Sequence, residues 1–514
     1  MKIKKPFFIH PFLFALYPIL AIYSHNINEA TFTQTLTPTI YTLTLTAIVF
    51  LVNSIIFKNF QKAGIITTLF LLLFFSYGHI FNMLLKQGWV QGWVLLYRQL
   101  TYIFEFIVFC LIFLSVSYFI FKKDKKMSNL TIFLNIVSIV LILILLANIT
   151  AYKAKIWIGE RNTNKILNSK KESLLINENK KKSNQFEILP DIYYIILDAY
   201  GSSSVLQEFY NFNNHEFIDY LSGKEFYIAS KSVSNYPETY LSLTSSLNME
   251  YLPTSNNADK RKYYAKLQDN MVLTFLKAQG YTYVHLGSSY EVTRVSKHAD
   301  ININFGLSEF ERILINSTIL RPFLALFDLD ISERKEHWKR ILYKLDKLDQ
   351  ISKIKDPTFT FAHFIIPHEP SVFKKNGEFL RNLERYKTKP KHQYIEQIIF
   401  INTQLAKIIN KLLLETETLP IIILQADHGP LFTRNEFMHR FTEKMVKKRF
   451  GILNAYYLPG VNKSSLYPSI TPVNSFRLIF NLYFGTHYDL LPDKVYMQGV
   501  KQPHRFIDVT NKIK

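Results

Sequence analysis

Residues 419–430 read LPIIILQADHGP, an apolar run that ends in an adjacent aspartate and histidine, Asp427 and His428. An unbroken apolar run of this length is typical of a strand that is buried on both faces of a parallel sheet. In open α/β sheets, ligands bind beyond the carboxyl ends of the strands. An aspartate and a histidine at that place offer an oxygen and a nitrogen to a divalent cation. A turn with a hydrogen-bonded aspartate is the alternative interpretation of this pair.

The same pattern extends from this strand in both directions. From Asp191 onward, short apolar runs alternate with segments of helical periodicity. This alternation predicts an α/β domain with a mainly parallel sheet sandwiched by helices. Strands are expected at residues 192–197, 281–286, 359–366, 421–425 and 451–458, and helices at residues 205–221, 270–279, 333–354, 393–414 and 474–483.

Two further segments carry residues that could take part in chemistry. The first expected strand ends in Asp198, which places a second carboxylate at the edge of the sheet, although such an aspartate often caps a helix. Residues 234–249 read SNYPETYLSLTSSLNM, in which Thr239 leads into an expected helix. A helix N-terminus can receive an anion, and a base or a metal can turn a hydroxyl into a nucleophile. Taken alone, the segment fits Thr239 as a helix N-cap equally well.

The first 150 residues have a different composition. They hold 11 of the 61 Lys and Arg residues and 3 of the 40 Asp and Glu residues of the chain. Five apolar runs in this part approach or reach the roughly 20 residues that a helix needs to cross a bilayer. They cover residues 9–23, 38–57, 63–85, 101–121 and 130–152. The sequence therefore predicts a membrane anchor of about five spans and excludes a single soluble domain.

The positive charges predict the orientation of this anchor. With a cytoplasmic N-terminus, the cytoplasmic ends of the spans carry nine lysines, whereas the outer connections carry only Lys86 and Arg98. This bias places the chain after the fifth span outside the cytoplasm. Polar and basic residues then dominate up to residue 190. We therefore expect an anchor at residues 1–152, a basic linker at 153–190 and an extracytoplasmic catalytic domain at 191–514 of a multi-pass membrane protein.

The chain resembles the alkaline phosphatase/sulfatase superfamily in three segments, which contain Asp198, YPET at 236–239 and ADHGP at 426–430. The resemblance is to the membrane-anchored branch with lipoteichoic acid synthases and phosphoethanolamine transferases. It extends over about residues 191–485 and includes HFIIPHEP at 363–370 and RFGILNAYYLPG at 449–460. It implies an alkaline-phosphatase-like domain carried by a membrane anchor.

The resemblance also implies a metal site and a nucleophile. One or two divalent cations, Zn or Mn, are implied, and the ligands of one of them would be Asp198, Thr239, Asp427 and His428. Thr239 would form a covalent phospho-threonine. His368 and His439 are similar to histidines that steady the transferred group or a second metal, with His363 as an alternate for His368. Lipid-headgroup transferases usually have Glu where this chain has Asp198, which loosens the assignment to any one transferase subgroup.

The function implied is a metal-dependent phosphotransferase or phosphodiesterase acting on headgroups of membrane phospholipids, of the phosphoglycerol or phosphoethanolamine type. The acceptor would be an envelope glycan or lipid. A sulfatase-type sulfuric ester hydrolase is the alternative, but the residues that follow Thr239 lack the Pro and Arg of the sulfatase pattern. A catalytically silent envelope assembly protein is the third possibility. Competent residues at all four ligand positions argue against it.

The net charge of +21 does not indicate a nucleic-acid partner. Many of the basic residues belong to the cytoplasmic ends of the spans and to the linker, and no basic surface with interleaved aromatic residues is apparent. Cys110 is the single cysteine, which excludes a disulfide scaffold.

Overall fold

The computed structural model describes residues 7–27, 32–85, 98–122, 127–178, 189–254, 260–326, 333–416, 418–430, 442–499 and 505–513. The chain divides into two compact units. Unit 1 comprises Met1–Lys180 and Leu307–Ile331, and unit 2 comprises Lys181–Gly306 and Ser332–Lys514. The chain therefore enters unit 2 once, leaves it again, and returns.

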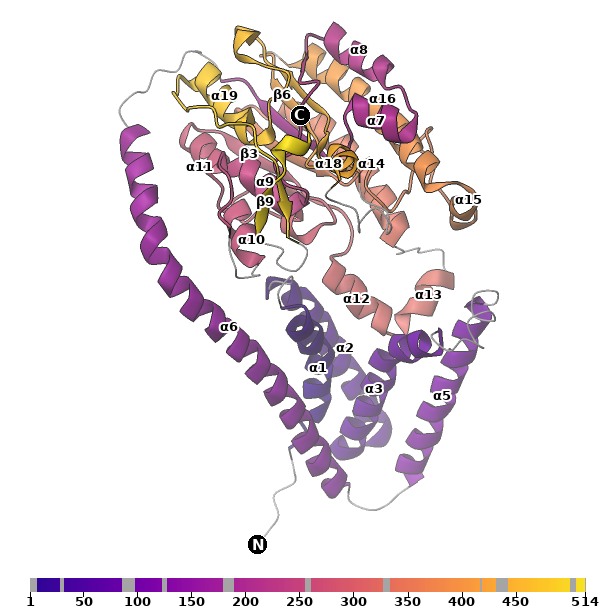
Figure 1. Ribbon diagram of the computed structural model, residues 1–514. Helices are drawn as coiled ribbons and strands as arrows, with labels where there is room; N and C mark the ends of the chain where they lie inside the picture. The colour runs from indigo at the N-terminus through magenta and orange to yellow at the C-terminus, as the bar shows by residue number, and fades with distance from the viewer. Residues whose placement is uncertain are drawn as a thin grey trace. The chain divides into compact units, whose positions relative to one another are not determined.

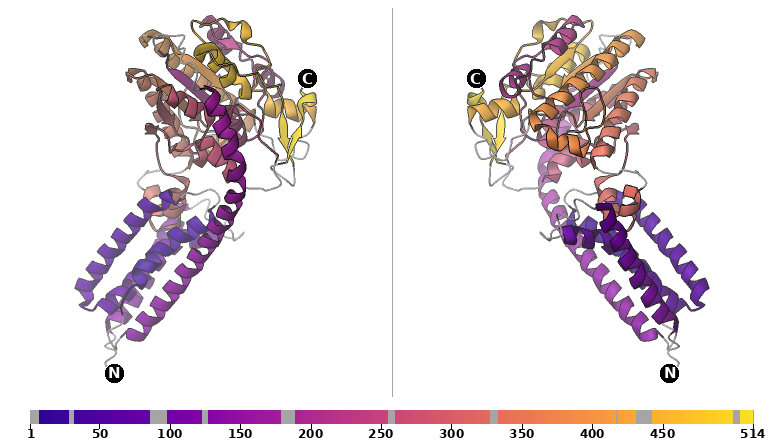
Figure 2. Two further views of the ribbon diagram at one scale, coloured as in Figure 1. Left: turned by 90° about the vertical axis from the view of Figure 1, so that its left-hand side faces the viewer. Right: turned by 90° about the vertical axis from the view of Figure 1, so that its right-hand side faces the viewer.

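Unit 1 is a bundle of helices. Its N-terminal part consists of α1 (His10–His25), α2 (Thr33–Phe57), α3 (Phe60–Leu85), α5 (Arg98–Lys122) and α6 (Ser128–Glu178), which run side by side in both views of Figure 2. Four of these helices are long and apolar enough to cross a membrane, which is one fewer than expected. The first expected span, residues 9–23, forms α1, which has 16 residues. Helix α6 extends through most of the segment that was expected to be a linker.

The exposed surface of this bundle is apolar. Ile55 and Phe104 are 75% and 69% exposed, whereas Tyr77 is completely buried. Polar side chains pair inside the bundle: Asn53 donates to the Thr67 hydroxyl at 3.3 Å. This distribution is that of a bundle whose surroundings are lipid, because apolar side chains then face outward and polar groups bond to one another.

A second segment of unit 1 comes from far along the chain. Helices α12 (Glu309–Ser317) and α13 (Leu320–Leu326), here called the excursion, pack on the N-terminal helices. Phe310 and Leu314 join a cluster with residues of α1 and α6. The backbone of Asn316 lies so close to Gly78 that a Cβ atom there would be 1.9 Å from the Asn316 oxygen. The glycine therefore permits a contact that no other residue allows.

Unit 2 is built on a seven-stranded sheet of order β2-β7-β6-β1-β5-β3-β4. The central strand β1 is parallel to both of its neighbours, β5 and β6, and β3 and β4 continue the parallel part. At the other edge, β7 runs antiparallel to β6, and β2 runs antiparallel to β7. The bounds are β1 Ile192–Leu197, β2 Tyr227–Ile228, β3 Thr282–Leu286, β4 Ile301–Ile303, β5 Thr358–Phe364, β6 Ile421–Gln425 and β7 Asn454–Tyr457. The prediction of a mainly parallel sheet is confirmed.

Helices cover both faces of this sheet (Figure 1). The residues of β1 alternate between two apolar cores, as a strand buried on both faces must. The first core is closed by α8 (His215–Gly223), α14 (Glu333–Gln350) and α16 (Pro390–Glu415), and the second by α9 (Thr239–Asn248), α11 (Met271–Ala278) and α19 (Pro472–Phe484). The remaining elements are α7 (Ser203–Tyr210), α10 (Arg261–Gln268), α15 (Asn382–Lys387), α18 (Glu443–Phe450) and the hairpin of β8 (Tyr496–Gln498) and β9 (Phe506–Asp508).

The helix expected at residues 205–221 is two helices. Helix α7 ends at Tyr210, and its C-cap Asn211 has a φ of 52°, in the left-handed region. Helix α8 begins four residues after Asn211. Asparagine tolerates this conformation better than most residues do, and it commonly ends a helix in this way.

Candidate metal centre

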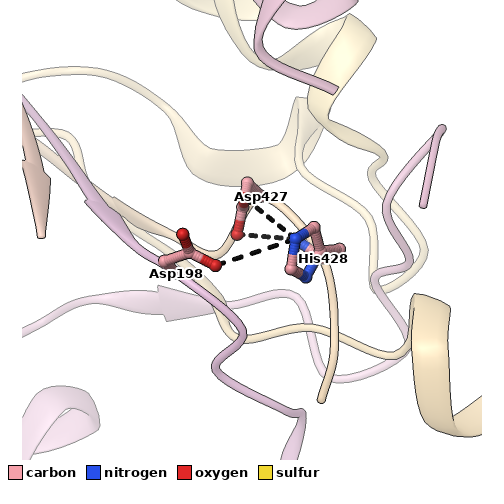
Figure 3. Close-up of side chains that lie close together, drawn as sticks. All are labelled: Asp198, Asp427 and His428. Atoms are coloured by element: carbon pink, nitrogen blue, oxygen red, sulfur yellow. Dashed lines mark hydrogen bonds and ion pairs between the residues drawn. The ribbon is translucent and has the colours of Figure 1, made fainter. Parts of the chain in front are cut away.

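Asp198, Asp427 and His428 come together at the carboxyl ends of two neighbouring strands, β1 and β6 (Figure 3). The Nε2 atom of His428 lies 3.7 Å from Asp198 Oδ1 and 3.3 Å from Asp427 Oδ2. All three side chains are buried. The parallel pairing of β1 with β6 produces this arrangement, since it brings the ends of both strands to the same edge of the sheet.

Backbone N–H groups fix the orientation of Asp427. Its Oδ1 accepts from the N–H of Ala199 at 3.2 Å and from that of His428 at 2.9 Å. Its Oδ2 is buried and has no hydrogen-bond partner among the described residues, and the same holds for Oδ1 of Asp198. One oxygen of each carboxylate is therefore left for a ligand.

The ring of His428 is held in one tautomer. Its Nδ1 lies 3.0 Å from the backbone carbonyl of Gly429. A carbonyl oxygen can only accept, so Nδ1 carries the proton and Nε2 is an unprotonated acceptor. That nitrogen faces the unpartnered oxygens of Asp198 and Asp427. Three acceptors that face one another in a buried place repel, unless a positive charge lies between them.

Thr239 is the first residue of α9, and its side chain points at the same place. Its hydroxyl lies 3.3 Å from Nε2 of His428. The preceding residue, Glu238, is the N-cap with extended backbone and makes no side-chain cap bond. Thr239 therefore is not the N-cap of α9, and its hydroxyl is available to the site.

The electrostatics of the site favour a cation. Burial raises the pKa of Asp427 to about 6, and the charge of Asp198 adds to this shift. Burial acts in the same direction on Asp198, but facing histidines, first His368, outweigh it and lower its pKa. The pKa of His428 is lowered to about 3 by burial and then by the charge of Arg449. Two close carboxylates beside a neutral imidazole make a site in which a positive ligand is stabilised.

These residues fit a divalent cation. Two carboxylate oxygens, one imidazole nitrogen with the correct tautomer and one hydroxyl form a mixed oxygen and nitrogen set, which suits Zn²⁺ or Mn²⁺. The carbonyl of Gly429 gives His428 the outer partner that metal-binding histidines usually have.

The three further histidines expected at the site differ in their distance from it and in whether the structure describes them. His363, at the end of β5, is completely buried, and its Nε2 lies 3.5 Å from Asp198 Oδ2. Its Nδ1 is 2.8 Å from the Thr293 hydroxyl. The ring of His368 is 6.3 Å from the ring of His428. His439 lies outside the described residues.

Sequence reasoning did not single out Arg449 or Thr293. Thr293 lies in a short 3₁₀ turn and contacts the site only through His363. Arg449 is one of three successive basic residues at the end of α18, a pattern typical of an exposed helix end. The structure shows it 2% exposed instead.

No family model matches the sequence, and a search of curated proteins by sequence finds no match. Similar solved structures include the periplasmic domain of EptC from Escherichia coli, with 12% identity, a TM-score of 0.43, and coverage of 64% of this chain and 94% of that one. The integral membrane phosphoethanolamine transferase EptA from Neisseria meningitidis shows 11% identity, a TM-score of 0.38, and coverage of 92% and 95%.

A third similar structure, yidJ from Bacteroides fragilis, is described as a sulfatase. It shows 11% identity, a TM-score of 0.36, and coverage of 62% of this chain and 83% of that one. Identities and scores this low do not transfer an activity, so the function has to be argued from the site.

Proposed function

We propose that this protein is a metal-dependent enzyme of the alkaline phosphatase/sulfatase type that transfers or hydrolyses the phosphorylated headgroup of a membrane phospholipid. The observation that carries the proposal is the Thr239 hydroxyl at a helix N-terminus, 3.3 Å from Nε2 of His428 and beside the unpartnered oxygens of Asp198 and Asp427. A hydroxyl beside a cation site is the arrangement that nucleophilic attack on phosphorus requires.

Each residue has a defined part in this chemistry. The Oγ1 of Thr239 forms a bond to phosphorus while the bond from phosphorus to the glycerol oxygen of the lipid breaks. The proton lost by Thr239 is balanced by one gained on the leaving oxygen, so the products are diacylglycerol and Thr239 carrying the phosphorylated headgroup as a phosphodiester. An acceptor hydroxyl, or water, then attacks the same phosphorus and restores the threonine.

The ligand residues prepare this step. Asp198, Asp427 and His428 would hold one divalent cation, Zn or Mn. When bound, such a cation lowers the pKa of the hydroxyl and neutralises charge on the phosphoryl oxygens. The N-terminus of α9 adds backbone N–H groups on the same side. His363 and His368 would steady the phosphoryl group or a second cation, and His439 is proposed for the same role.

The helical unit supports a lipid as the substrate. Its four long apolar helices would hold the enzyme in the cell membrane, and the lysine distribution places unit 2 outside the cytoplasm. The donor would therefore be a phospholipid of the phosphoglycerol or phosphoethanolamine class, and the acceptor an envelope glycan or lipid. The similar structures whose descriptions name a phosphoethanolamine transferase fit this class of donor.

The test is headgroup transfer by the full chain and its Thr239→Ala variant in vesicles. Phosphatidylglycerol and phosphatidylethanolamine with a radiolabelled headgroup serve as the two donors. We expect the loss of the nucleophile to lower turnover by about 10⁴-fold or more. Wild-type enzyme quenched during turnover should carry the phosphoethanolamine or phosphoglycerol group of the donor on Thr239, detectable by peptide mass spectrometry.

Thr403→Ala is the matched control. Its hydroxyl bonds only within α16, to the carbonyl of Ile399, so turnover should not change. Equal turnover by wild type and Thr239→Ala would contradict the nucleophile. Faster cleavage of an aryl sulfate than of the matching aryl phosphate would favour a sulfatase, and purified protein without Zn or Mn under replete conditions would favour a silent assembly protein.

A further inference from the structure

We propose that Arg449 is a positioning residue that fixes the Thr239 hydroxyl at its place relative to Asp427 and His428. The proposal goes beyond the ligand residues, because it assigns Arg449 a role through its bonds to the backbone carbonyls of Gly429 and Pro237. It rests on the function proposed above only for the part of its test that measures turnover.

The two arms of Arg449 contact the two segments that carry the site. Nη1 donates to the carbonyl of Gly429, directly after the Asp427–His428 pair, at 3.0 Å. Nη2 donates to the carbonyl of Pro237, two residues before Thr239. These segments are far apart in the sequence, so a single planar guanidinium joins the nucleophile segment to the ligand segment.

The backbone around Arg449 reinforces this connection. The Gly429 N–H donates to the Arg449 carbonyl at 2.7 Å, and the Ser234 N–H donates to the Phe450 carbonyl at 2.8 Å. A Cβ atom on Gly429 would lie 2.3 Å from the carbonyl oxygen of Lys448, so only glycine fits there. The ligand segment is thus held against the end of α18 by its backbone as well as by the side chain.

The segment after β1 meets the same stretch of chain. The Ser202 N–H donates to the Gly451 carbonyl at 3.1 Å, and the Leu453 N–H donates to the Tyr200 carbonyl at 3.2 Å. Residues 449–453 therefore contact all three segments that supply Asp198, Thr239 and the Asp427–His428 pair. The distance between nucleophile and ligands depends on this stretch.

A role in packing alone does not explain an arginine at this place. A buried guanidinium beside a cation site is electrostatically costly, and an apolar side chain would fill the same volume without that cost. Burial lowers the pKa of Arg449, and the charges of Glu238, Asp427 and Asp198 act in the opposite direction without cancelling this shift. What the guanidinium adds over an apolar side chain is a pair of donors in fixed geometry, each directed at one site segment.

The experiment compares Arg449→Lys and Arg449→Met with the same two changes at Arg477, in the full chain in detergent. Arg477 is a matched control because it also joins two carbonyls of unit 2, those of Met249 and Asp489. The measurements are the Zn²⁺ and Mn²⁺ dissociation constants by chelator competition, the rise in melting temperature caused by each metal, and kcat and KM for an aryl phosphate.

We expect Arg449→Met to raise the metal dissociation constants about 10- to 100-fold and to lower kcat by a similar factor, with KM little changed. Arg449→Lys should recover part of the metal affinity and part of kcat, since lysine keeps the charge but can reach only one carbonyl at a time. The Arg477 variants should lower the melting temperature only. If Arg449→Met does not fold, the Lys variant decides the question alone.

Unchanged metal affinity and unchanged kcat in both Arg449 variants would overturn the proposal. Equal losses in the Arg477 variants would overturn it too, because the effect would then be one of general stability. A wild-type chain without turnover on any phosphate ester, in which the Arg449 variants still bind metal more weakly, would refute the proposed function and still support the positioning role.

Discussion

The two units handle buried and exposed groups in opposite ways. In unit 2 every residue of β1 is completely buried, whereas in unit 1 large apolar residues such as Ile55 and Phe104 are mostly exposed. Both units bury polar side chains, yet Asn53 and Thr67 of unit 1 bond to one another, while Asp198 and Asp427 of unit 2 each keep one oxygen without a partner. Burial therefore has different consequences in the two units: in unit 1 it separates polar groups from the apolar surroundings, and in unit 2 it leaves two carboxylate oxygens of the proposed metal site without a partner.

The largest effect is expected at the proposed metal site of unit 2, where two buried carboxylates lie close together. We predict that Asp427→Asn lowers turnover by about 10⁴-fold and abolishes metal binding. In metal-free protein the same change should raise the melting temperature, because it removes a buried charge and its repulsion by Asp198, which are the two causes that raise the pKa of Asp427. Aryl phosphate turnover and thermal melting in chelator measure the two results.

Asp300→Asn is the control for this prediction. Asp300 bonds Lys277 and the Tyr283 N–H at the edge of the sheet, and these partners lower its pKa. Its replacement should reduce stability slightly and leave turnover unchanged. A lower melting temperature for metal-free Asp427→Asn would contradict the view that the two carboxylates destabilise the empty fold.

A change in unit 1 should affect the reaction on membrane lipids without affecting turnover of a water-soluble substrate. Gly78→Ala places a methyl group where the Asn316 backbone lies, so the excursion cannot dock as it does. We expect a destabilisation of unit 1 of about 1–3 kcal/mol, which is the usual cost of overpacking. Aryl phosphate turnover should stay at the wild-type level. Headgroup transfer from vesicles should fall, because the excursion is joined at both ends to unit 2 and belongs to the membrane unit that this change destabilises.

Gly223→Ala is the matched control in unit 2, because no atom lies within 4 Å of the added Cβ. It should change neither activity. If Gly78→Ala reduced turnover of the aryl phosphate as strongly as headgroup transfer, the excursion would act on the chemistry itself and the separation of the two units would not hold.

The smallest expected effect concerns pH and unit 2. His285 is buried, and burial lowers its pKa to about 4 from 6.5. Between these values the unfolded chain binds a proton that the folded chain does not, so stability falls as the pH decreases from 6.5 toward 4. We expect this residue to contribute a loss of about 1 kcal/mol between pH 7.5 and 5.5.

His285→Gln should reduce this pH dependence while lowering stability at pH 7.5, because two hydrogen bonds of the ring are disturbed. Urea unfolding followed by near-ultraviolet circular dichroism at the two pH values measures both. An identical pH dependence in wild type and variant would show that His285 is not the group concerned.

Part of this architecture could be predicted from the sequence, for physical reasons. The bounds of β1 and β6 agree with the expected 192–197 and 421–425, because a strand buried on both faces is a continuous apolar run that polar residues end. Thr239 begins a helix as expected. The chemical roles of Thr239, Asp198, Asp427 and His428 remain predictions, although the structure brings these residues together.

Other features have no local signal. Phe310 and Leu314 have the spacing of any amphipathic helix, and nothing in that spacing indicates that their partners are residues of α1 and α6. Arg449 follows two lysines, and its partners are carbonyl groups, which no sequence pattern reveals. Long-range contacts of these two kinds have to be seen in three dimensions.

The excursion has a practical consequence for work with a water-soluble fragment. A fragment that begins at residue 191 still contains Leu307–Ile331, the piece of unit 1 that comes late in the chain. Without α1, α3, α5 and α6, the side chains of Phe310 and Leu314 would lose their cluster and face water, which favours aggregation. Replacement of residues 307–331 by a short polar loop should therefore raise the yield of soluble enzyme more than any choice of the first residue.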